Sequence, residues 1–167
     1  SQDIVSVLAP ISGMELFTRL DSAQYKAACW IIFDDPRSVS VSDASLVQRY
    51  LLALFYYENS GIEWLVNDDK IKFLSESKEC EWIGVECNES DAVVKLNMSN
   101  MQIKGNLLRE LSNLRSLEYI DLARNKLDGT IPSEFSQLSK LKGLQMSYNS
   151  LDGTIPEELF WLFGLEY

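Results

Sequence analysis

The segment Leu127-Asp128-Gly129-Thr130-Ile131-Pro132 recurs letter for letter as Leu151-Asp152-Gly153-Thr154-Ile155-Pro156, 24 residues further along the chain. Units of this length run over residues 93–116, 117–140 and 141–164, and a further unit starts at Leu165. A fixed period of this size indicates a solenoid, in which each coil buries its apolar face only against its neighbours. The apolar positions that keep the period include Leu96, Ile120 and Leu144; Met98, Leu122 and Met146; Leu111, Phe135 and Leu159; and Leu114, Leu138 and Leu162.

Polar residues, glycines and prolines at fixed places in the units have structural explanations. Asn125 and Asn149 follow the predicted strands, where a buried side-chain amide can bond backbone groups of the bend and of adjacent coils. Gly129 suits a bend, and Pro132 fixes φ where no hydrogen-bond donor is needed. We therefore expect such residues to hold the coils together rather than to contact ligands.

Residues 93–167 resemble the plant-type leucine-rich repeat, LxxLxxLxLxxNxLxGxIP, and the second unit matches it from Leu117 to Pro132. The first unit departs from the pattern at Met101, which replaces the Asn, and at Leu108, which replaces the Pro. This departure puts the asparagine ladder in doubt in the first unit. The resemblance implies an α/β fold, a right-handed solenoid of three 24-residue repeats, whose strands line a concave face and whose exposed strand positions carry recognition.

The same resemblance supplies the candidate ligand-binding residues, which we call the concave-face residues: Tyr119, Asp121, Arg124, Gln145, Ser147 and Tyr148. Matching positions in the first unit hold Lys95, Asn97 and Ser99. Aromatic and charged side chains together are typical of a protein contact patch. Three coils, however, expose a strand surface only roughly 15 Å wide. Ordinary solvent-facing strand surface is therefore an equally open interpretation of these residues.

The charge of the chain is concentrated in its first half. The 167 residues include 25 acidic and 15 basic ones, for a net charge of −10, and residues 1–92 hold 16 of the acids and 7 of the bases. An acidic surface repels phosphate backbones and anionic lipid headgroups, so we expect neither nucleic acid nor a membrane surface as a partner. Histidine is absent, which excludes Ser-His-Asp and Cys-His nucleophile pairs and histidine metal sites. We expect no enzyme activity, no metal and no cofactor.

Cys80 and Cys87 flank a Trp-containing segment that resembles the CxWxGVxC signature of the cap preceding plant-type repeats. In that cap the two cysteines bond to each other, and Trp82 would pack over the first coil. A redox pair or a zinc site would need closer spacing or further ligands. A disulfide in this position implies an oxidising compartment.

The rest of the first half is predicted to be helical. A helix over 24–33 would end at Asp34-Asp35-Pro36, with Asp34 and Asp35 in the terminal turn rather than in a calcium or acid–base site. Cys29 on this helix is expected to be a buried free thiol, the alternative being an exposed or intermolecular thiol. A second helix would start at Ser42 or Asp43 and run to about Glu58. Residues 22–92 together resemble the long cap of diatom leucine-rich-repeat proteins, whereas residues 1–21 match no family.

Two sequons, at Asn88 and Asn97, are candidate glycosylation sites if the chain enters the secretory pathway. A glycan on Asn97 would obstruct the concave face, which favours Asn88. The apolar runs reach only seven or eight residues, too few for a transmembrane helix, so we expect no membrane insertion in this segment. The chain starts at Ser1, and any targeting signal is expected to lie outside it.

These observations predict two parts: a helical capping domain over 1–92 and repeats over 93–167. The function they favour is non-catalytic recognition of a protein, peptide or glycan by a fragment of a secreted or membrane-anchored receptor-like protein. Its expected location is extracellular, and an organelle lumen stays open as an alternative. The competing hypotheses are a structural subunit docked in a larger assembly and a secreted enzyme inhibitor.

Overall fold

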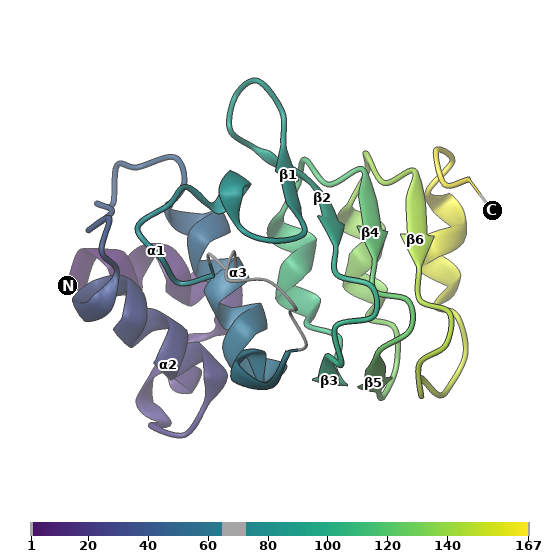
Figure 1. Cartoon of the computed structure of the whole chain (residues 1–167), viewed down its shortest axis with the longest axis horizontal. Coiled ribbons are helices and arrows are strands. Elements are labelled where there is room, and N and C mark those ends of the chain that lie inside the picture. Colours follow the sequence, from purple (N-terminus) through teal and green to yellow (C-terminus); the bar gives the residue numbers. More distant parts are fainter. Residues whose placement is uncertain (1, 65–72, 167) are drawn as a thin grey trace.

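The computed structural model describes residues 2–64 and 73–166, as a helical first half followed by stacked coils (Figure 1). The helices are α1 (Gln2–Ser12), α2 (Ala23–Cys29), which continues as a π-helical turn η2 (Trp30–Asp34), and α3 (Leu46–Glu58). Short 3₁₀ helices are η1 (Met14–Thr18), η3 (Gly61–Glu63), η4 (Glu79–Glu81), η5 (Arg109–Asn113), η6 (Ser133–Gln137) and η7 (Glu157–Trp161).

The larger sheet, sheet A, contains β1 (Val85–Cys87), β2 (Val93–Asn97), β4 (Tyr119–Asp121) and β6 (Gly143–Gln145), in the order β1-β2-β4-β6. Strands β2, β4 and β6 are parallel, whereas β1 is antiparallel to β2. Leu96 pairs with Ile120, and Ile120 with Leu144, so each coil contributes one strand at the 24-residue period. The boundary predicted after residue 92 falls between β1 and β2, and β1 extends the sheet of the coils.

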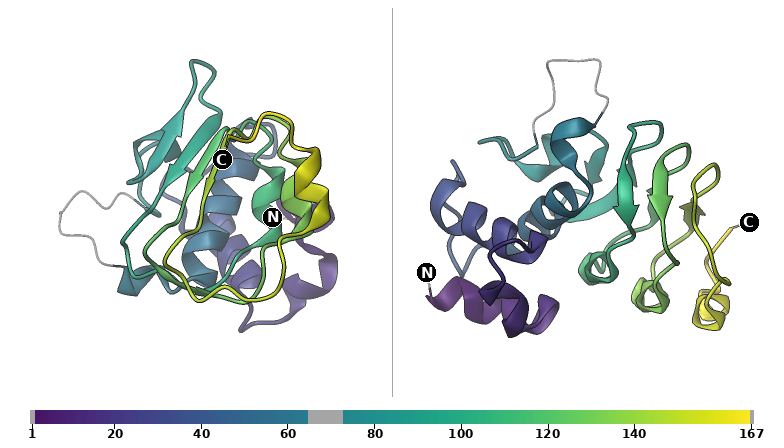
Figure 2. Two further views of the ribbon diagram at one scale, coloured as in Figure 1. Left: turned by 90° about the vertical axis from the view of Figure 1, so that its right-hand side faces the viewer. Right: turned by 90° about the horizontal axis from the view of Figure 1, so that it is seen from below.

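A second, two-stranded parallel sheet joins β3 (Lys104–Asn106) to β5 (Lys126–Asp128). The 3₁₀ helices η5, η6 and η7 lie on the side of the coils away from sheet A (Figure 2). Each coil thus has a strand side and a helical side, with the apolar core between them.

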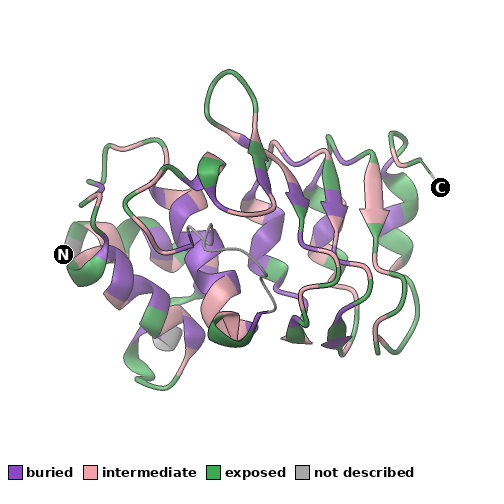
Figure 3. Cartoon of the chain, viewed as in Figure 1, coloured by how far each residue is buried: buried purple, intermediate pink, exposed green. Residues whose placement is uncertain are grey.

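One continuous core fills both halves of the chain (Figure 3). In the coils it includes Leu96, Ile120 and Phe135, all at most 1% exposed. In the third coil Leu159, the equivalent of Phe135, is 3% exposed, whereas the strand residues Leu144 and Met146 are only half-buried. Each coil therefore depends on a neighbour to complete its burial.

The asparagine ladder is confirmed for the second and third coils. The Asn125 Oδ1 atom accepts hydrogen bonds from the backbone N–H groups of Met101 (2.9 Å) and Ile103 (3.1 Å). Its Nδ2 donates to the carbonyl oxygens of Met98 (2.8 Å) and Leu122 (2.9 Å). Asn149 repeats the arrangement one coil later, accepting from Leu127 N and donating to the Leu122 and Met146 carbonyl oxygens.

The first coil has no ladder asparagine of its own, because Met101 offers no side-chain amide. It is joined to the helical half at a different place: Asn59, at the end of α3, donates to the carbonyl oxygens of Lys104 (3.0 Å) and Asn106 (3.1 Å) on β3. Asn59 is fully buried. This contact fixes the first coil to α3.

The helices differ in detail from the sequence-based expectation. Helix α3 begins at Leu46, with Ser45 rather than Ser42 or Asp43 at its N-cap position. The Asp43 carboxylate instead accepts from the backbone N–H and the hydroxyl of Ser45, which lowers the pKa of Asp43. Cys29 is free but only half-buried, so the expectation of a buried thiol is wrong; it lines an apolar groove between α1 and α2.

A buried ion cluster around Arg49 was not foreseen from the sequence. The guanidinium donates to both carboxylate oxygens of Asp35, at 2.8 and 2.6 Å, and to Glu79 at 3.1 Å. It also lies 5.1 Å from the Trp30 ring and 4.9 Å from the Trp82 ring. Asp35 therefore does more than end a helix, and Trp82, expected over the first coil, packs within the helical half.

Candidate functional site

The outer surface of sheet A presents the residues that alternate with the buried ones. In β4, Ile120 points into the core, so its neighbours Tyr119 and Asp121 point outward. The strand register aligns Lys95, Tyr119 and Gly143 in one row, and Asn97, Asp121 and Gln145 in the next. The predicted concave-face residues of these strands therefore share one surface.

Tyr119 lies across the neighbouring strand. A Cβ atom added to Gly143 would sit 2.7 Å from Cδ1 of the Tyr119 ring, closer than side chains approach one another. The ring occupies the space that a side chain at position 143 would fill, and 41% of Tyr119 stays exposed. Gly143 was not identified from the sequence as part of the site. The sequence does contain a signal for it, because the matching positions of the two earlier coils hold the large residues Lys95 and Tyr119, whereas this position holds glycine.

Arg124 and Tyr148 form a second aromatic feature beyond the ends of β4 and β6. The Arg124 guanidinium carbon lies 4.7 Å from the centre of the Tyr148 ring, a cation–π contact, and Tyr148 is 73% exposed. Both residues have left-handed backbone conformations, with φ of 57° and 58°. Asn100, at the equivalent place in the first coil, has a φ of 59°. The coil geometry thus imposes this conformation, which non-glycine residues adopt only at a cost.

The structure separates the concave-face residues into two groups. Tyr119 stands at the start of β4, whereas Arg124 lies in the bend that follows its end, five residues later in the chain. Asp121 lies between them, and its Oδ1 accepts from the backbone N–H of Ala123 at 3.0 Å. Gln145 and Ser147 are exposed on the adjacent coil.

The matching positions of the first coil bond to one another or to β1. Lys95 forms an ion pair with Glu86 at 2.9 Å. The Ser99 hydroxyl donates to Asn97 Oδ1 at 3.3 Å, and Asn97 is exposed on the surface that the concave-face residues share. A charged pair of Lys142 with Glu118 borders Tyr119, and the hydrogen bond to Glu118 raises the pKa of Lys142.

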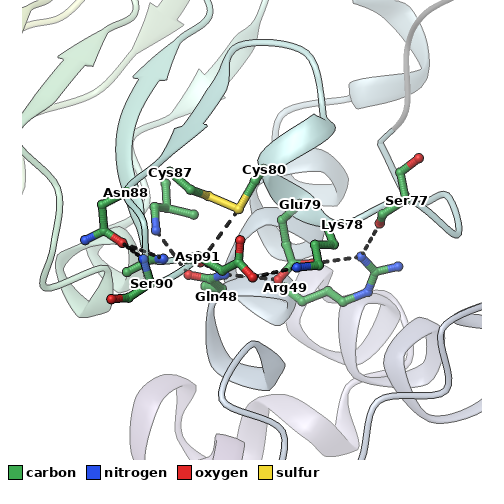
Figure 4. Close-up of a disulfide and its surroundings, with 12 residues drawn as sticks. Gln48, Arg49, Ser77, Lys78, Glu79, Cys80, Cys87, Asn88, Ser90 and Asp91 are labelled. Carbon is green, nitrogen blue, oxygen red and sulfur yellow. Dashed lines mark hydrogen bonds and ion pairs between the residues drawn. A yellow bond between two sulfur atoms is a disulfide. The ribbon is translucent and has the colours of Figure 1, made fainter.

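The disulfide links η4 to β1, and the first sequon lies in the turn between β1 and β2 (Figure 4). Cys80 and Cys87 are bonded, with their Cα atoms 5.4 Å apart. Asn88 is exposed, and its Oδ1 accepts from the backbone N–H groups of Ser90 (2.9 Å) and Ala92 (3.1 Å). Gln48 ties this turn to α3 by donating to the Asp91 carbonyl oxygen at 2.8 Å.

Within residues 2–64 and 73–166, no three or more Cys, Asp or Glu side chains gather in an arrangement that could hold a metal ion. Over the same part of the chain, no helix has the length and apolar character needed to cross a membrane. What the described surface offers is a row of aromatic, polar and charged groups on a rigid sheet.

Comparison with protein families identifies the coils. Residues 93–151 match the family model described as leucine rich repeat. Among curated proteins, a probable leucine-rich repeat receptor-like protein kinase of Arabidopsis thaliana is 37% identical over 65 residues, which are 38% of this chain and 7% of that protein. The chain therefore spans only a small part of this relative's length.

Solved structures show the same fold in plant receptor ectodomains. The BIR3–SERK2 complex of Arabidopsis thaliana has 28% identity and a TM-score of 0.54, over 67% of this chain and 64% of that chain. The leucine-rich-repeat ectodomain of the membrane receptor kinase GASSHO1/SCHENGEN3 of Arabidopsis thaliana, in complex with CASPARIAN STRIP INTEGRITY FACTOR 2, has 25% identity and a TM-score of 0.56. That match covers 72% of this chain and 14% of the ectodomain.

Proposed function

We propose that this chain is a non-catalytic recognition module from a receptor-like leucine-rich-repeat protein, which binds a protein or peptide through its concave-face residues. The observation that carries the proposal is the exposed Arg124–Tyr148 pair on the same sheet side as Tyr119. Tyr and Arg are the side chains most often found at the energetic centres of protein interfaces. Support for a receptor-like role comes from the relatives, which are named as receptor kinases or receptor ectodomains.

The geometry favours an extended ligand over a compact one. Tyr119 lies at the start of β4, and the Arg124–Tyr148 pair follows the ends of β4 and β6, so the two groups lie at opposite ends of the strands. A peptide lying along the strand direction could contact both groups at once, with Asp121 between them. Since the surface is made of rigid strands, little ordering of the protein would be needed on binding.

An extracellular location fits this proposal. The Cys80–Cys87 disulfide persists only in an oxidising environment. Exposed Asn88 is the better of the two glycosylation candidates, because a glycan on Asn97 would cover the surface proposed to bind the ligand. Mass spectrometry of the chain secreted from a eukaryotic host would test both sites, and full occupancy of Asn97 together with undiminished ligand binding would contradict this use of the surface.

Selection from a displayed library of random 12-residue peptides tests the proposal and does not require the natural ligand. The whole chain is the bait, and a variant carrying Tyr119→Ser, Arg124→Ser and Tyr148→Ser is the counter-selection bait. Most enriched peptides should fail to bind the variant, whose circular dichroism spectrum should be unchanged because the replaced side chains are exposed. Enriched peptides that bind both baits equally would remove the concave-face assignment.

Gly143→Ala offers a subtler test of the same surface. The added Cβ would displace the Tyr119 ring while keeping every charge and hydrogen bond of the site. We expect the selected peptides to bind this variant more weakly. Unchanged affinity would show that the position of the Tyr119 ring is irrelevant to recognition.

A docked subunit is the second candidate, and one observation favours it. Ile155 is 61% exposed, whereas its equivalents Ile131 and Leu107 in the earlier coils are half-buried and 6% exposed. A permanent partner could cover this surface, and so could a further coil, because Leu107 and Ile131 are each followed by one. The mass of native material by size-exclusion chromatography with light scattering distinguishes the two candidates, because a free monomer is incompatible with a permanently docked subunit.

A further inference from the structure

Three exposed aromatic side chains lie on the helical side of the third coil, away from sheet A. We call them the lateral aromatic patch: Phe160, Trp161 and Phe163, which are 59%, 72% and 88% exposed. The Trp161 and Phe163 rings contact each other edge to face, with centroids 6.4 Å apart. Figure 2 shows η7, which carries Phe160 and Trp161, on the opposite side of the coil from β6. The patch is therefore separate from the concave-face residues.

The repeat itself does not require aromatic residues at these places. One period earlier the same positions hold Ser136, Gln137 and Ser139, and two periods earlier they hold Ser112, Asn113 and Arg115. In those coils the core is formed by other residues, such as Leu111 and Phe135. The aromatic residues are thus a property of the third coil alone and not part of the pattern that builds the solenoid.

Another stacked coil would cover only part of the patch. Ser136 and Ser112, the equivalents of Phe160, are half-buried and 3% exposed, so a following coil would cover Phe160. Gln137 and Ser139, the equivalents of Trp161 and Phe163, are exposed although the third coil follows them. In the first coil Asn113 is half-buried, whereas Arg115 is exposed even though it donates to Gln137 of the second coil. Trp161 in part and Phe163 in full therefore stay accessible beside a further coil, which leaves them to a separate molecule.

The exposed area of the patch and the charges near it indicate what kind of molecule would cover it. Aromatic side chains carry about 150–250 Å² each, so the exposed fractions leave on the order of 400 Å², half of what each partner buries in a complex of standard size. Two exposed acids, Glu157 and Glu158, lie on η7 with Phe160 and Trp161, and the nearest basic residue along the chain in the preceding coil is Lys140, which is also exposed. A second copy of the chain would oppose acid to acid, which disfavours a homodimer.

We propose that the lateral aromatic patch is the docking surface for a protein partner that offers an apolar pocket ringed by Lys or Arg side chains. Trp161 is the anchor, because Trp is the residue most enriched at interface hot spots and its ring is the broadest of the three. Phe160 and Phe163 flank it, and Glu157 and Glu158 on η7 meet the basic rim. The chain would then hold two partners on opposite sides.

The fluorescence of Trp161 can be used to measure binding to the patch. The other three Trp residues, Trp30, Trp64 and Trp82, are 5%, 6% and 1% exposed, so acrylamide quenches mainly Trp161. The probe is an 18-residue helical peptide with Leu on one face and Lys on the other. One control peptide has Glu in place of Lys, and another has Ser in place of Leu. We expect the Leu–Lys peptide alone to shift the emission to the blue and to reduce acrylamide quenching at least threefold.

The matched variant gives the third coil the surface of the second: Phe160→Ser, Trp161→Gln and Phe163→Ser. Anisotropy of the labelled Leu–Lys peptide should show at least tenfold weaker binding to this variant, whereas Tyr119→Ser with Tyr148→Ser should bind as the unaltered chain does. Equal binding of the Leu–Glu peptide, equal binding by the lateral variant, or loss of binding in the concave-face variant would each overturn the proposal. A dimer in sedimentation equilibrium that the lateral variant abolishes would overturn it in favour of a second copy.

Discussion

Replacement of Asn125 by Ala should remove a large share of the stability of the solenoid. Asn125 is 8% exposed and makes four hydrogen bonds of 3.1 Å or less to backbone groups of two coils. A buried polar group left without a partner costs about 1–3 kcal/mol. We expect Asn125→Ala to lower the free energy of unfolding by about 4 kcal/mol. This value is the lower end of the range for four unpaired backbone groups, because the slight exposure of the site lets water reach some of them. Domains of this size have roughly 5–15 kcal/mol in total.

Urea denaturation followed by circular dichroism measures this loss as a lower midpoint at an unchanged slope. The matched controls are Asn149→Ala, in a half-buried site of the last coil, with an expected loss of about 1–2 kcal/mol, and Asn113→Ala, which breaks one bond to the Glu110 carbonyl oxygen. Asn125→Asp adds a pH test. A buried carboxylate facing the Met98 and Leu122 carbonyl oxygens should have a raised pKa, so this variant should gain stability as the pH falls. A loss below about 1 kcal/mol for Asn125→Ala, or a loss equal to that of Asn149→Ala, would refute the reasoning.

Three further perturbations test the helical half. Ser in place of Cys80 and Cys87, which are seven residues apart, should cost about 2.5 kcal/mol in urea denaturation, the chain-entropy value for so short a loop. Arg49→Met leaves the buried Asp35 carboxylate without its guanidinium and Glu79 with only that of Arg37, and should cost about 3–5 kcal/mol in the same assay. Desolvation and the nearby charge of Glu110 raise the pKa of Glu58 above 4.5 in the folded chain. The contribution of Glu58 to the free energy of folding is therefore favourable below pH 4.5 and is lost as the pH rises through the folded pKa. Glu58→Gln should therefore raise the melting temperature at pH 7 but not at pH 4.

Each of these three predictions for the helical half has an outcome that would contradict it. Equal urea midpoints for the oxidised and the Ser-substituted chain would mean that the disulfide constrains nothing. A mild effect of Arg49→Met, comparable to that of Arg37→Met in a partly exposed position, would show that the cluster is already hydrated. A melting temperature that responds to pH identically with Glu58 and with Gln would assign the pH dependence to another group.

The sequence predicted those parts of the fold that repeat. Strand register and the roles of Asn125 and Asn149 follow from a pattern that recurs letter for letter, because equivalent residues must occupy equivalent places in stacked coils. The helix ending before Pro36 and the helix ending at Glu58 were visible from local signals. Their capping details were not, since Ser42, Asp43 and Ser45 are all acceptable N-cap residues by type.

Contacts between distant segments could not be predicted in this way. Arg49 meets Asp35 and Glu79 only once three segments are folded together, and nothing in the local sequence pairs them. Asn59 directly follows α3, and nothing in the local sequence shows that it donates to the Lys104 and Asn106 carbonyl oxygens of the first coil. The same limit applies to the candidate site. The sequence predicted the concave-face residues as a single group, whereas in the structure Tyr119 lies at the start of a strand and Arg124 and Tyr148 lie beyond the strand ends.

The affinity of a selected peptide for single-residue variants tests the central claim most directly. Isothermal titration would compare Arg124→Ala with Arg109→Ala, a likewise exposed arginine on η5 at the helical side of the first coil. If the concave-face residues carry recognition, Arg124→Ala weakens binding at least tenfold, about 1.4 kcal/mol, and Arg109→Ala changes it less than twofold. Equal affinities for the two variants would contradict recognition through this surface.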